Sequence, residues 1–181
     1  MAHLLAAAER GMTRSPTDTA AFERFWQPHR PRVWRLIARL AGSVDLADDL
    51  TQEVSLRAFR GFGAFRSGAA GYTWLYRIAV NVVLRHRERV APDTVSWDGA
   101  LQVADPGQNP QAALFQSEIR PIIWAALNRL PDEQRTTIIL SVYEELPYRE
   151  IAAVLEIPLG TVKSRLHVGM ARLREELKDA L

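Results

Sequence analysis

The stretch from Leu146 to Leu173, LPYREIAAVLEIPLGTVKSRLHVGMARL, decides the fold of this chain, because it predicts two short helices joined by a tight corner. Pro158 cannot continue the first helix and biases the residue before it toward extended backbone, which places the corner at residues 156–158. Apolar residues recur at the spacing of one helical face in both helices: Tyr148, Ile151, Ala152 and Leu155 in the first, and Val162, Leu166, Met170, Leu173 and Leu177 in the second.

Polar side chains face outward near the start of the second helix, namely Thr161, Lys163, Ser164 and His167. This arrangement is typical of a helix-turn-helix, whose second helix enters the major groove of DNA. An ordinary helical hairpin is the alternative, but the short corner and the basic, hydroxylic surface favour DNA binding. Glu156 occupies a corner position often taken by Gly, so a positive φ there would strain the backbone by about 1 kcal/mol.

Composition limits the classes of protein that this chain can belong to. With 181 residues, 48% of them hydrophobic, the chain can form one medium or two small domains. The absence of cysteine excludes disulfides and thiolate metal sites and fits a reducing cytoplasm. The first residues lack the basic start of a signal peptide, and no window approaches a membrane span. We therefore expect a soluble, cytoplasmic protein with no membrane span.

The net charge of +2 hides an uneven distribution along the chain. Residues 14–90 hold 13 Lys and Arg against 7 Asp and Glu, a net of +6, whereas residues 91–145 hold 3 against 8, a net of −5. For any single charge, ordinary solvated surface is the simplest interpretation. A basic first half and a helix-turn-helix at the end nevertheless suggest two separate contacts with nucleic acid.

The first half of the chain predicts four helices. Residues 19–26 and 32–40 form two amphipathic runs that Pro28 and Pro31 should separate, and Gly42 should cap the second run, whose outer face is basic (Arg32, Arg35 and Arg39). Ser43 or Asp45 can cap the third helix, whose inner face is Leu46, Leu50, Val54 and Ala58. Its outer face gathers Asp48, Asp49, Gln52 and Glu53, which indicates either a well-capped solvated helix or a docking face for a basic partner.

Residues 61–71 predict a Gly- and Ala-rich loop that carries Phe62, Phe65 and Arg66. The loop is either a plain connector or a platform on which an unpaired base stacks. The fourth helix follows, with Leu75, Ile78, Ala79, Val82 and Val83 inward and a basic surface of Arg77, Asn81, Arg85, Arg87 and Arg89. Trp74 and Tyr76 are predicted to belong to the core.

Residues 91–111 contain Pro, Gly and Asp without a helical period, which indicates a linker between domains. Beyond the linker, Pro121 should kink a helix or mark its start. Pro131 should open another helix that runs through Tyr143, with Ile138, Ile139 and Val142 in a small core. No strand pattern occurs in the sequence. We predict an all-α protein with a tail at 1–18, small helical domains at 19–90 and 112–181, and a flexible linker at 91–111.

Several motifs together resemble the extracytoplasmic-function sigma factors of the sigma-70 family. They are DDLTQEVSLRAFR and YTWLYRIAVN in the first half, and LPDEQR, YREIAAVL and PLGTVKSRL in the second, in the order of that family. The resemblance implies sigma region 2 in the first domain and sigma region 4 in the second. It also implies a protein without enzymatic chemistry or cofactor that binds core RNA polymerase, directs it to promoters and helps to melt the minus-ten element.

The resemblance assigns roles to individual residues. The resemblance implies that the clamp of the largest polymerase subunit is bound by Asp48, Asp49, Gln52 and Glu53. It implies that the melted non-template strand at minus ten is read by Phe65, Arg66, Arg77, Asn81 and Arg85. Contacts to the duplex minus-thirty-five element are implied for Thr161, Lys163, Ser164, Arg165 and His167, with Arg149 and Arg172 on phosphates. The polymerase flap and an anti-sigma factor are the further partners that the family implies.

The sequence departs from the family at three positions. Val168 and Met170 stand where relatives often have basic residues, which predicts weaker or shifted minus-thirty-five contacts, and Gly71 stands where an aromatic is common, so that stacking should rest more on Phe65. A stand-alone helix-turn-helix regulator is the main alternative, although it leaves the acidic helix and the Phe65 loop unexplained. An enzyme is disfavoured, because the four His lack metal-ligand spacing and there is no phosphate-binding loop or nucleophile motif.

Overall fold

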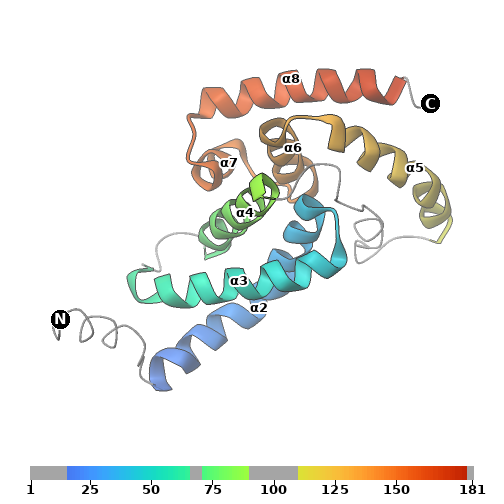
Figure 1. Ribbon diagram of the computed structural model, residues 1–181. Helices are drawn as coiled ribbons and strands as arrows, with labels where there is room; N and C mark the ends of the chain where they lie inside the picture. The colour runs from blue at the N-terminus through green and yellow to red at the C-terminus, as the bar shows by residue number, and fades with distance from the viewer. Residues whose placement is uncertain (1–15, 66–70, 90–109, 179–181) are drawn as a thin grey trace.

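The computed structural model describes residues 16–65, 71–89 and 110–178, and all regular structure in these ranges is helical. The elements are α2 (Pro16–Ala41), α3 (Val44–Gly61), the 3₁₀ turn η2 (Phe62–Ala64), α4 (Gly71–Arg89), α5 (Pro110–Arg129), α6 (Asp132–Ile138), the π-helical turn η5 (Ile139–Tyr143), α7 (Tyr148–Leu155) and α8 (Leu159–Lys178). Figure 1 shows α2, α3 and α4 on one side of the molecule and α5 to α8 on the other. The expected all-α fold is confirmed.

Helices α2, α3 and α4 pack against one another around a shared apolar core. Their inner faces are fully buried at Val33, Leu36, Ile37, Val54, Ala58, Leu75 and Ala79. Gly42 ends α2 with φ 74, and Ser43 caps α3, since its Oγ accepts a hydrogen bond from the Leu46 amide at 3.3 Å. Of the two caps that the sequence allowed, the structure uses Ser43.

The expected break in the first helix is wrong, because α2 runs through both Pro28 and Pro31 without interruption. Each proline removes one backbone hydrogen bond at a cost of about 3 kcal/mol in a helix interior. Buried side chains on both sides of the prolines, such as Phe22 and Trp26 before them and Val33 after them, hold the two parts in one helix. Tertiary packing therefore overrides the local preference of the prolines.

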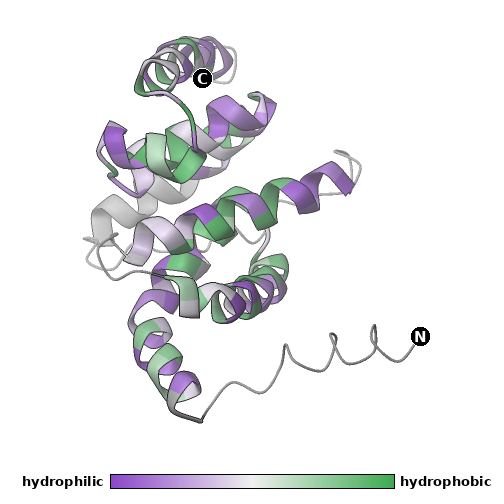
Figure 2. Cartoon of the chain, turned by 90° about the vertical axis from the view of Figure 1, so that its left-hand side faces the viewer, coloured by the Kyte–Doolittle hydropathy of each residue, from purple (hydrophilic) through white to green (hydrophobic). Residues whose placement is uncertain are grey.

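The second group of helices has α8 packed on α5, α6 and α7, and its buried side chains belong to the same apolar cluster as those of the first group. The fully or almost fully buried members include Trp124, Leu127, Ile138, Leu140, Ile151 and Val162. Helix α5 continues through Pro121, so this proline lies inside the helix and does not mark its start. In Figure 2 the apolar segments of these helices lie mainly where neighbouring helices face one another.

The π-helical turn η5 changes the register of the chain after α6. Within it the Glu144 amide donates to the Ile139 carbonyl at 3.2 Å, five residues back, so this turn contains one residue more than an α-helical turn. As a consequence Val142 is 53% exposed, which makes its predicted place in the core wrong, while Leu140 is fully buried. The same turn leads into Glu144, whose carboxylate points into the structure and is almost fully buried.

Helices α7 and α8 form the predicted helix-turn-helix, with the corner at Glu156 in the left-handed region, at φ 54. Two expected core positions are wrong, because Tyr148 is 44% and Met170 is 41% exposed. Val154 on α7 and Gly169, next to Met170 on α8, are buried although they were not expected in the core. A Cβ atom on Gly169 would lie 3.0 Å from the Ile138 Cδ1 atom, so α8 approaches α6 closely at this point. The hydrophobic period alone could not show which residue faces this narrow contact.

The two groups of helices also touch one another, because α4 packs against α7. Figure 1 shows α4 between α3 on one side and α7 on the other. Within the ranges that the structure describes, no helix is both long and apolar enough to span a bilayer.

Gly71, the first residue of α4, is predicted to be required for packing. A Cβ atom there would lie 2.6 Å from Cε2 of Phe25, so we expect Gly71→Ala to destabilise the protein by about 1 kcal/mol or more. Gly160 is the matched control, since a Cβ atom there meets nothing within 4 Å and Gly160→Ala should be neutral or stabilising by up to about 1 kcal/mol. Urea denaturation followed by circular dichroism measures both changes, and equal effects would contradict the packing argument.

Glu156 is predicted to strain the helix-turn-helix corner. Replacement by Gly removes the cost of a side chain at φ 54, whereas Glu156→Gln keeps the side chain and removes only the charge. We expect Glu156→Gly to be more stable than Glu156→Gln by about 1 kcal/mol in the same denaturation experiment. A Gly variant no more stable than the Gln variant would show that the corner is not strained.

Candidate nucleic-acid interface

The first turns of α8 present the polar surface expected of a recognition helix. Lys163, Ser164 and His167 are exposed, and Thr161 is half-buried. The Ser164 hydroxyl donates to the Thr161 carbonyl at 3.0 Å, which fixes its rotamer and leaves its oxygen lone pairs able to accept. Arg149 is exposed on α7. These side chains can offer donors and acceptors to a duplex without rearrangement of the backbone.

Arg165 and Arg172 of α8 are instead held against α6. Arg165 forms an ion pair with Glu133 at 2.9 Å and its side chain is 22% exposed, and Arg172 donates to Gln134 at 3.3 Å. Both partners lie in the acidic and amide-bearing first turn of α6. The structure therefore does not bring these two predicted DNA contacts onto the same free surface as Lys163, although both pairs are exposed enough to exchange for phosphate oxygens.

An aromatic cluster surrounds Phe65. The ring of Phe65 stacks on Trp74 with centroids 4.7 Å apart, and it lies 5.3 Å from Phe25 and 6.3 Å from Phe62. Phe25 comes from α2 and was not a predicted site residue. The Phe25 ring lies directly beside Gly71, because a Cβ atom on Gly71 would come within 2.6 Å of its Cε2 atom. Arg66 lies outside the described residues.

Helix α4 carries the remaining predicted minus-ten residues. Asn81 and Arg85 are exposed, while Arg77 is partly covered and forms an ion pair with Glu156 at 3.1 Å. The Tyr72 hydroxyl donates to Glu150, and this hydrogen bond is the main reason why the pKa of Tyr72 is raised. The guanidinium of Arg32 lies 5.5 Å from the Tyr72 ring centroid, as a cation–π contact. Basic and aromatic groups of α2 and α4 thus meet at one surface.

The acidic surface of α3 lies against α2 and has a shallow hollow of about 460 Å³. The hollow is lined by Trp26, Arg30, Asp48, Asp49, Thr51, Gln52 and Ser55. Asp48 accepts a hydrogen bond from the indole of Trp34 at 2.7 Å, and Glu53 pairs with Arg57 at 2.5 Å within the helix. Asp49 and Gln52 are exposed. The four predicted polymerase contacts therefore share one helix, where Asp48, Asp49 and Gln52 are exposed and Glu53 is half-buried.

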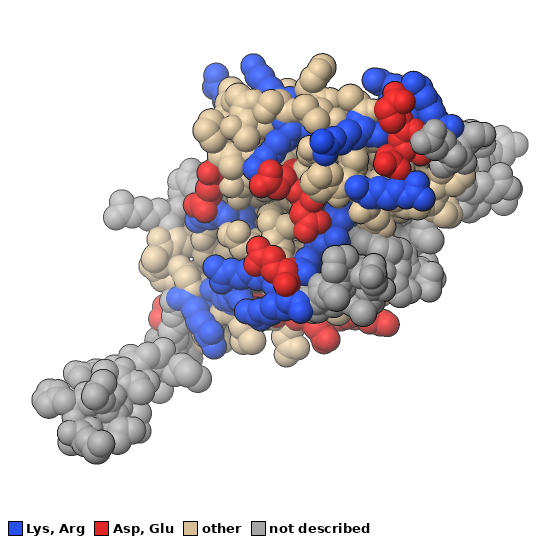
Figure 3. Space-filling view, turned by 45° about the horizontal axis from the view of Figure 1, so that its top comes forward, with Lys and Arg blue, Asp and Glu red and all other residues tan. Residues whose placement is uncertain are grey.

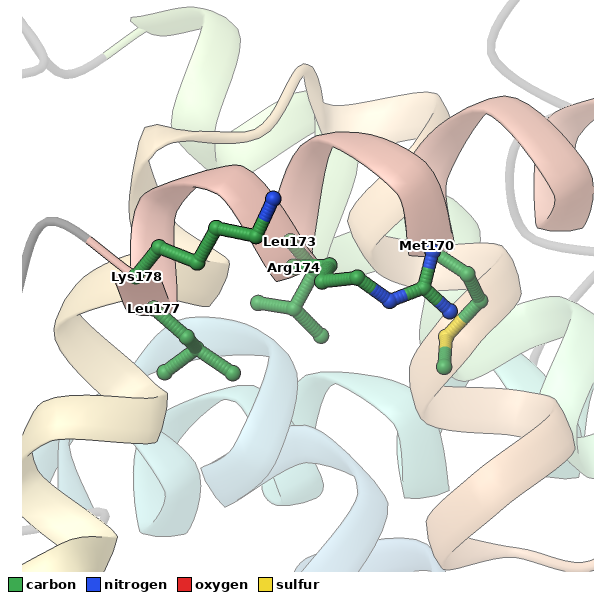
Figure 4. A pocket seen from close by; sticks show the side chains of 5 residues that line it. All are labelled: Met170, Leu173, Arg174, Leu177 and Lys178. Atoms are coloured by element: carbon green, nitrogen blue, oxygen red, sulfur yellow. The ribbon is translucent and has the colours of Figure 1, made fainter. Parts of the chain in front are cut away.

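A hollow of about 430 Å³ lies along α8, where Figure 4 shows the side chains of Met170, Leu173, Arg174, Leu177 and Lys178. On the face shown in Figure 3, basic and acidic side chains lie interspersed across both groups of helices. Among the described residues, no group of three or more His, Cys, Asp or Glu is arranged to hold a metal ion.

Comparison with known families matches each half of the chain separately. Residues 25–91 match the family model "Sigma-70 region 2", and residues 120–173 match "Sigma-70, region 4". The first match contains the acidic helix α3, the aromatic cluster around Phe65 and α4. The second contains α6, α7 and the start and middle of α8.

Relatives similar over almost the whole length include two bacterial sigma factors. The RNA polymerase sigma-H factor of Pseudomonas aeruginosa is 34% identical, over 91% of this chain and 88% of its own. The ECF RNA polymerase sigma factor SigW of Bacillus subtilis is 33% identical, over 90% of this chain and 91% of its own.

A solved structure extends the similarity to three dimensions. The sigma factor RpoE from Bartonella quintana, determined in complex with the anti-sigma factor NepR, shares 26% identity at a TM-score of 0.65, covering 87% of this chain and 97% of that one. The identity above 30% over nearly the full length, the matches to both region models and the shared fold all point to the same family. The chain belongs to the extracytoplasmic-function RNA polymerase sigma factors of the sigma-70 family.

Proposed function

We propose that this sigma factor, acting in the cytoplasm, docks on core RNA polymerase through the acidic surface of α3, and reads promoter DNA with α4 and α8, without enzymatic chemistry of its own. The observation that carries the proposal is the separation of surfaces. Acidic side chains gather on α3, whereas the aromatic cluster and the exposed basic turn of α8 lie on other elements. We further propose domains at residues 19–90 and 112–181, which the matches at 25–91 and 120–173 support.

At the minus-thirty-five element, the first turns of α8 enter the major groove of the duplex. Lys163 donates to the O6 and N7 acceptors of guanine, and Ser164 and His167 contact neighbouring bases or phosphates. Thr161 lies at the helix N-terminus, where the backbone amides favour a phosphate. Arg149, Arg165 and Arg172 serve as phosphate contacts, so they contribute affinity and salt dependence more than sequence choice.

At the minus-ten element, the unpaired non-template strand meets the aromatic cluster and α4. A base that leaves the DNA stack costs a few kcal/mol of stacking and pairing free energy. Stacking of that base on an aromatic side chain returns about 1–3 kcal/mol, and hydrogen bonds to the edge of the base offset the rest. Phe65 supplies the ring, and Arg66 follows it in the chain. Asn81 supplies a hydrogen-bond donor and an acceptor for a base edge, and Arg77 and Arg85 supply positive charges for phosphates. Phe25 and Trp74 act as positioning residues, because they hold the ring of Phe65.

The protein partners follow from the surfaces of each half. Asp48, Asp49, Gln52 and Glu53 meet a basic surface of the polymerase clamp, while the region 4 half contacts the flap. The similar structure of RpoE from Bartonella quintana contains the anti-sigma factor NepR, which supports an anti-sigma partner for this chain also. Such a partner acts by covering the same surfaces that polymerase and promoter use.

Promoter-specific transcription is the decisive test. We expect the purified chain to give discrete run-off transcripts from fragmented genomic DNA only when core RNA polymerase is present. Lys163→Ala should lower promoter binding by about tenfold and relax the preference for guanine at the contacted position. Lys178→Ala is the matched control, because this exposed lysine lies at the far end of the same helix. Binding to duplex DNA without any requirement for core would instead establish a stand-alone regulator.

Asp49→Asn is predicted to weaken binding to core RNA polymerase. The loss of one charge-assisted hydrogen bond of about 1.5–3 kcal/mol corresponds to a roughly ten- to hundredfold higher Kd, measured by fluorescence anisotropy of labelled protein. Asp45→Asn removes an equal charge from the first turn of the same helix and should leave Kd within about twofold. If both variants weaken binding equally, general charge attraction accounts for the interaction and the assigned contact is wrong.

A further inference from the structure

Val168 is an apolar side chain on the outer, largely polar face of α8, where it is 41% exposed. It follows Ser164 by four residues and Gly160 by eight, so the three lie in one line along the helix. Ser164 is exposed, and a Cβ atom on Gly160 would meet no described atom within 4 Å. Val168 therefore continues the surface of α8 that we assign to promoter DNA.

Packing on the inner side of α8 fixes the rotation of the helix that exposes Val168. Gly169, the next residue, is buried, and a Cβ atom on it would lie 3.0 Å from the Ile138 Cδ1 atom of α6. Val162 and Leu166 are buried on the same side of α8. A rotation that buried Val168 would move these side chains out of the core. The isopropyl group of Val168 is therefore held at the surface.

The basic neighbours of Val168 on the helix surface are directed toward α6. Arg165 precedes Val168 by three residues and Arg172 follows it by four, so both are its neighbours on one flank. Arg165 pairs with Glu133 at 2.9 Å, and Arg172 donates to Gln134 at 3.3 Å. The uncharged side chain of Val168 thus stays exposed between these two arginines and Ser164.

Met170, the other exposed apolar residue of this part of α8, has a different environment. It is also 41% exposed, but its side chain lines the apolar hollow along α8 together with Leu173 and Leu177 (Figure 4). Residues two apart in a helix point about 200° apart around its axis. The two residues are therefore equally exposed on different sides of one helix, and Val168 is the one in line with Ser164.

The chemistry of an isopropyl group selects one base in the major groove. Guanine, adenine and cytosine present hydrogen-bond donors or acceptors there, whereas thymine also presents its 5-methyl group. Valine can neither donate nor accept, so it leaves a polar base edge without a partner for its hydrogen bonds. Against a thymine methyl group, the same side chain removes apolar surface of both partners from water. A valine on this surface therefore favours thymine.

We propose that Val168 is a specificity-determining residue of α8 that contacts the 5-methyl group of a thymine in the minus-thirty-five element. The inference rests on the proposed function of α8 and adds a second kind of base selection to it. Lys163 selects guanine through hydrogen bonds, whereas Val168 selects thymine through apolar contact. Four residues of helix rise by about 6 Å, so this thymine lies about two base pairs from the contact of Ser164.

Replacement of single thymines by deoxyuridine tests the contact, because deoxyuridine lacks only the 5-methyl group. The thymines of both strands of the minus-thirty-five element of a run-off promoter are replaced one at a time, and the Kd of the holoenzyme for each labelled duplex is measured. We expect one position at which loss of the methyl group raises Kd by about fourfold. Holoenzyme with Val168→Ala should bind the thymine and deoxyuridine duplexes of that position with equal affinity.

Met170→Ala is the matched control, because it shortens an equally exposed apolar side chain on another side of the same helix. This variant should keep the fourfold difference between the two duplexes. Both substitutions introduce a good helix former at an exposed position, so we expect both variants to fold, and circular dichroism checks this.

A change of base preference is the second test. An arginine side chain donates to the O6 and N7 atoms of guanine, so Val168→Arg should change the preferred base at the identified position from thymine to guanine. The readout is the ratio of Kd values for the two duplexes, which a uniform gain of affinity for phosphates does not alter. A retained preference for thymine would contradict the assignment of Val168.

The failure of this inference is distinguishable from failure of the proposed function. Promoter-specific binding that no deoxyuridine weakens, or a minus-thirty-five element without thymine, overturns the role of Val168 and leaves the proposed function intact. A methyl effect that persists in Val168→Ala, or that Met170→Ala also abolishes, assigns the contact elsewhere and equally overturns it. A holoenzyme that prefers no promoter over unrelated DNA would overturn the proposed function, and the inference with it.

Discussion

The buried carboxylate of Glu144 is the interaction on which the arrangement of the two halves depends. A charge that is removed from water must be compensated, and here Arg39 supplies the opposite charge while Tyr76 donates to the second oxygen. Arg39 also lies 5.3 Å from the ring centroid of Tyr143, next to Glu144 in the chain. These contacts fix α2 and α4 of one half against the end of η5 in the other, and they bring α7 onto α4.

Local signals in the sequence were sufficient for much of the fold. The glycine at Gly42, the cap at Ser43 and the corner at Glu156 each act within a few residues, and the structure shows all three in the expected places. Local rules failed where distant packing decides. Helix α2 continues through Pro28 and Pro31, because buried side chains on both sides of the prolines keep the two parts in one helix.

The candidate site was predicted less completely than the fold, and the reasons are physical. The π-helical turn adds one residue to a helical turn without any clear mark in the sequence, so Val142 was expected inside and Glu144 was not recognised as a buried contact. Arg39 was assigned to an exposed basic face, because its partner lies 105 residues away. Nothing in a single sequence shows that the ring of Phe25 meets Phe65 from another helix.

The separation of 105 residues between Arg39 and Glu144 has an evolutionary consequence. A substitution at either position alone leaves a buried charge without its counterpart, whereas an exchange of both for apolar residues of similar volume can be nearly neutral. Selection that maintains this contact should therefore act on the two positions jointly. Among sigma factors that share it, the residues at these positions should covary, and lineages that have lost one should have lost the other.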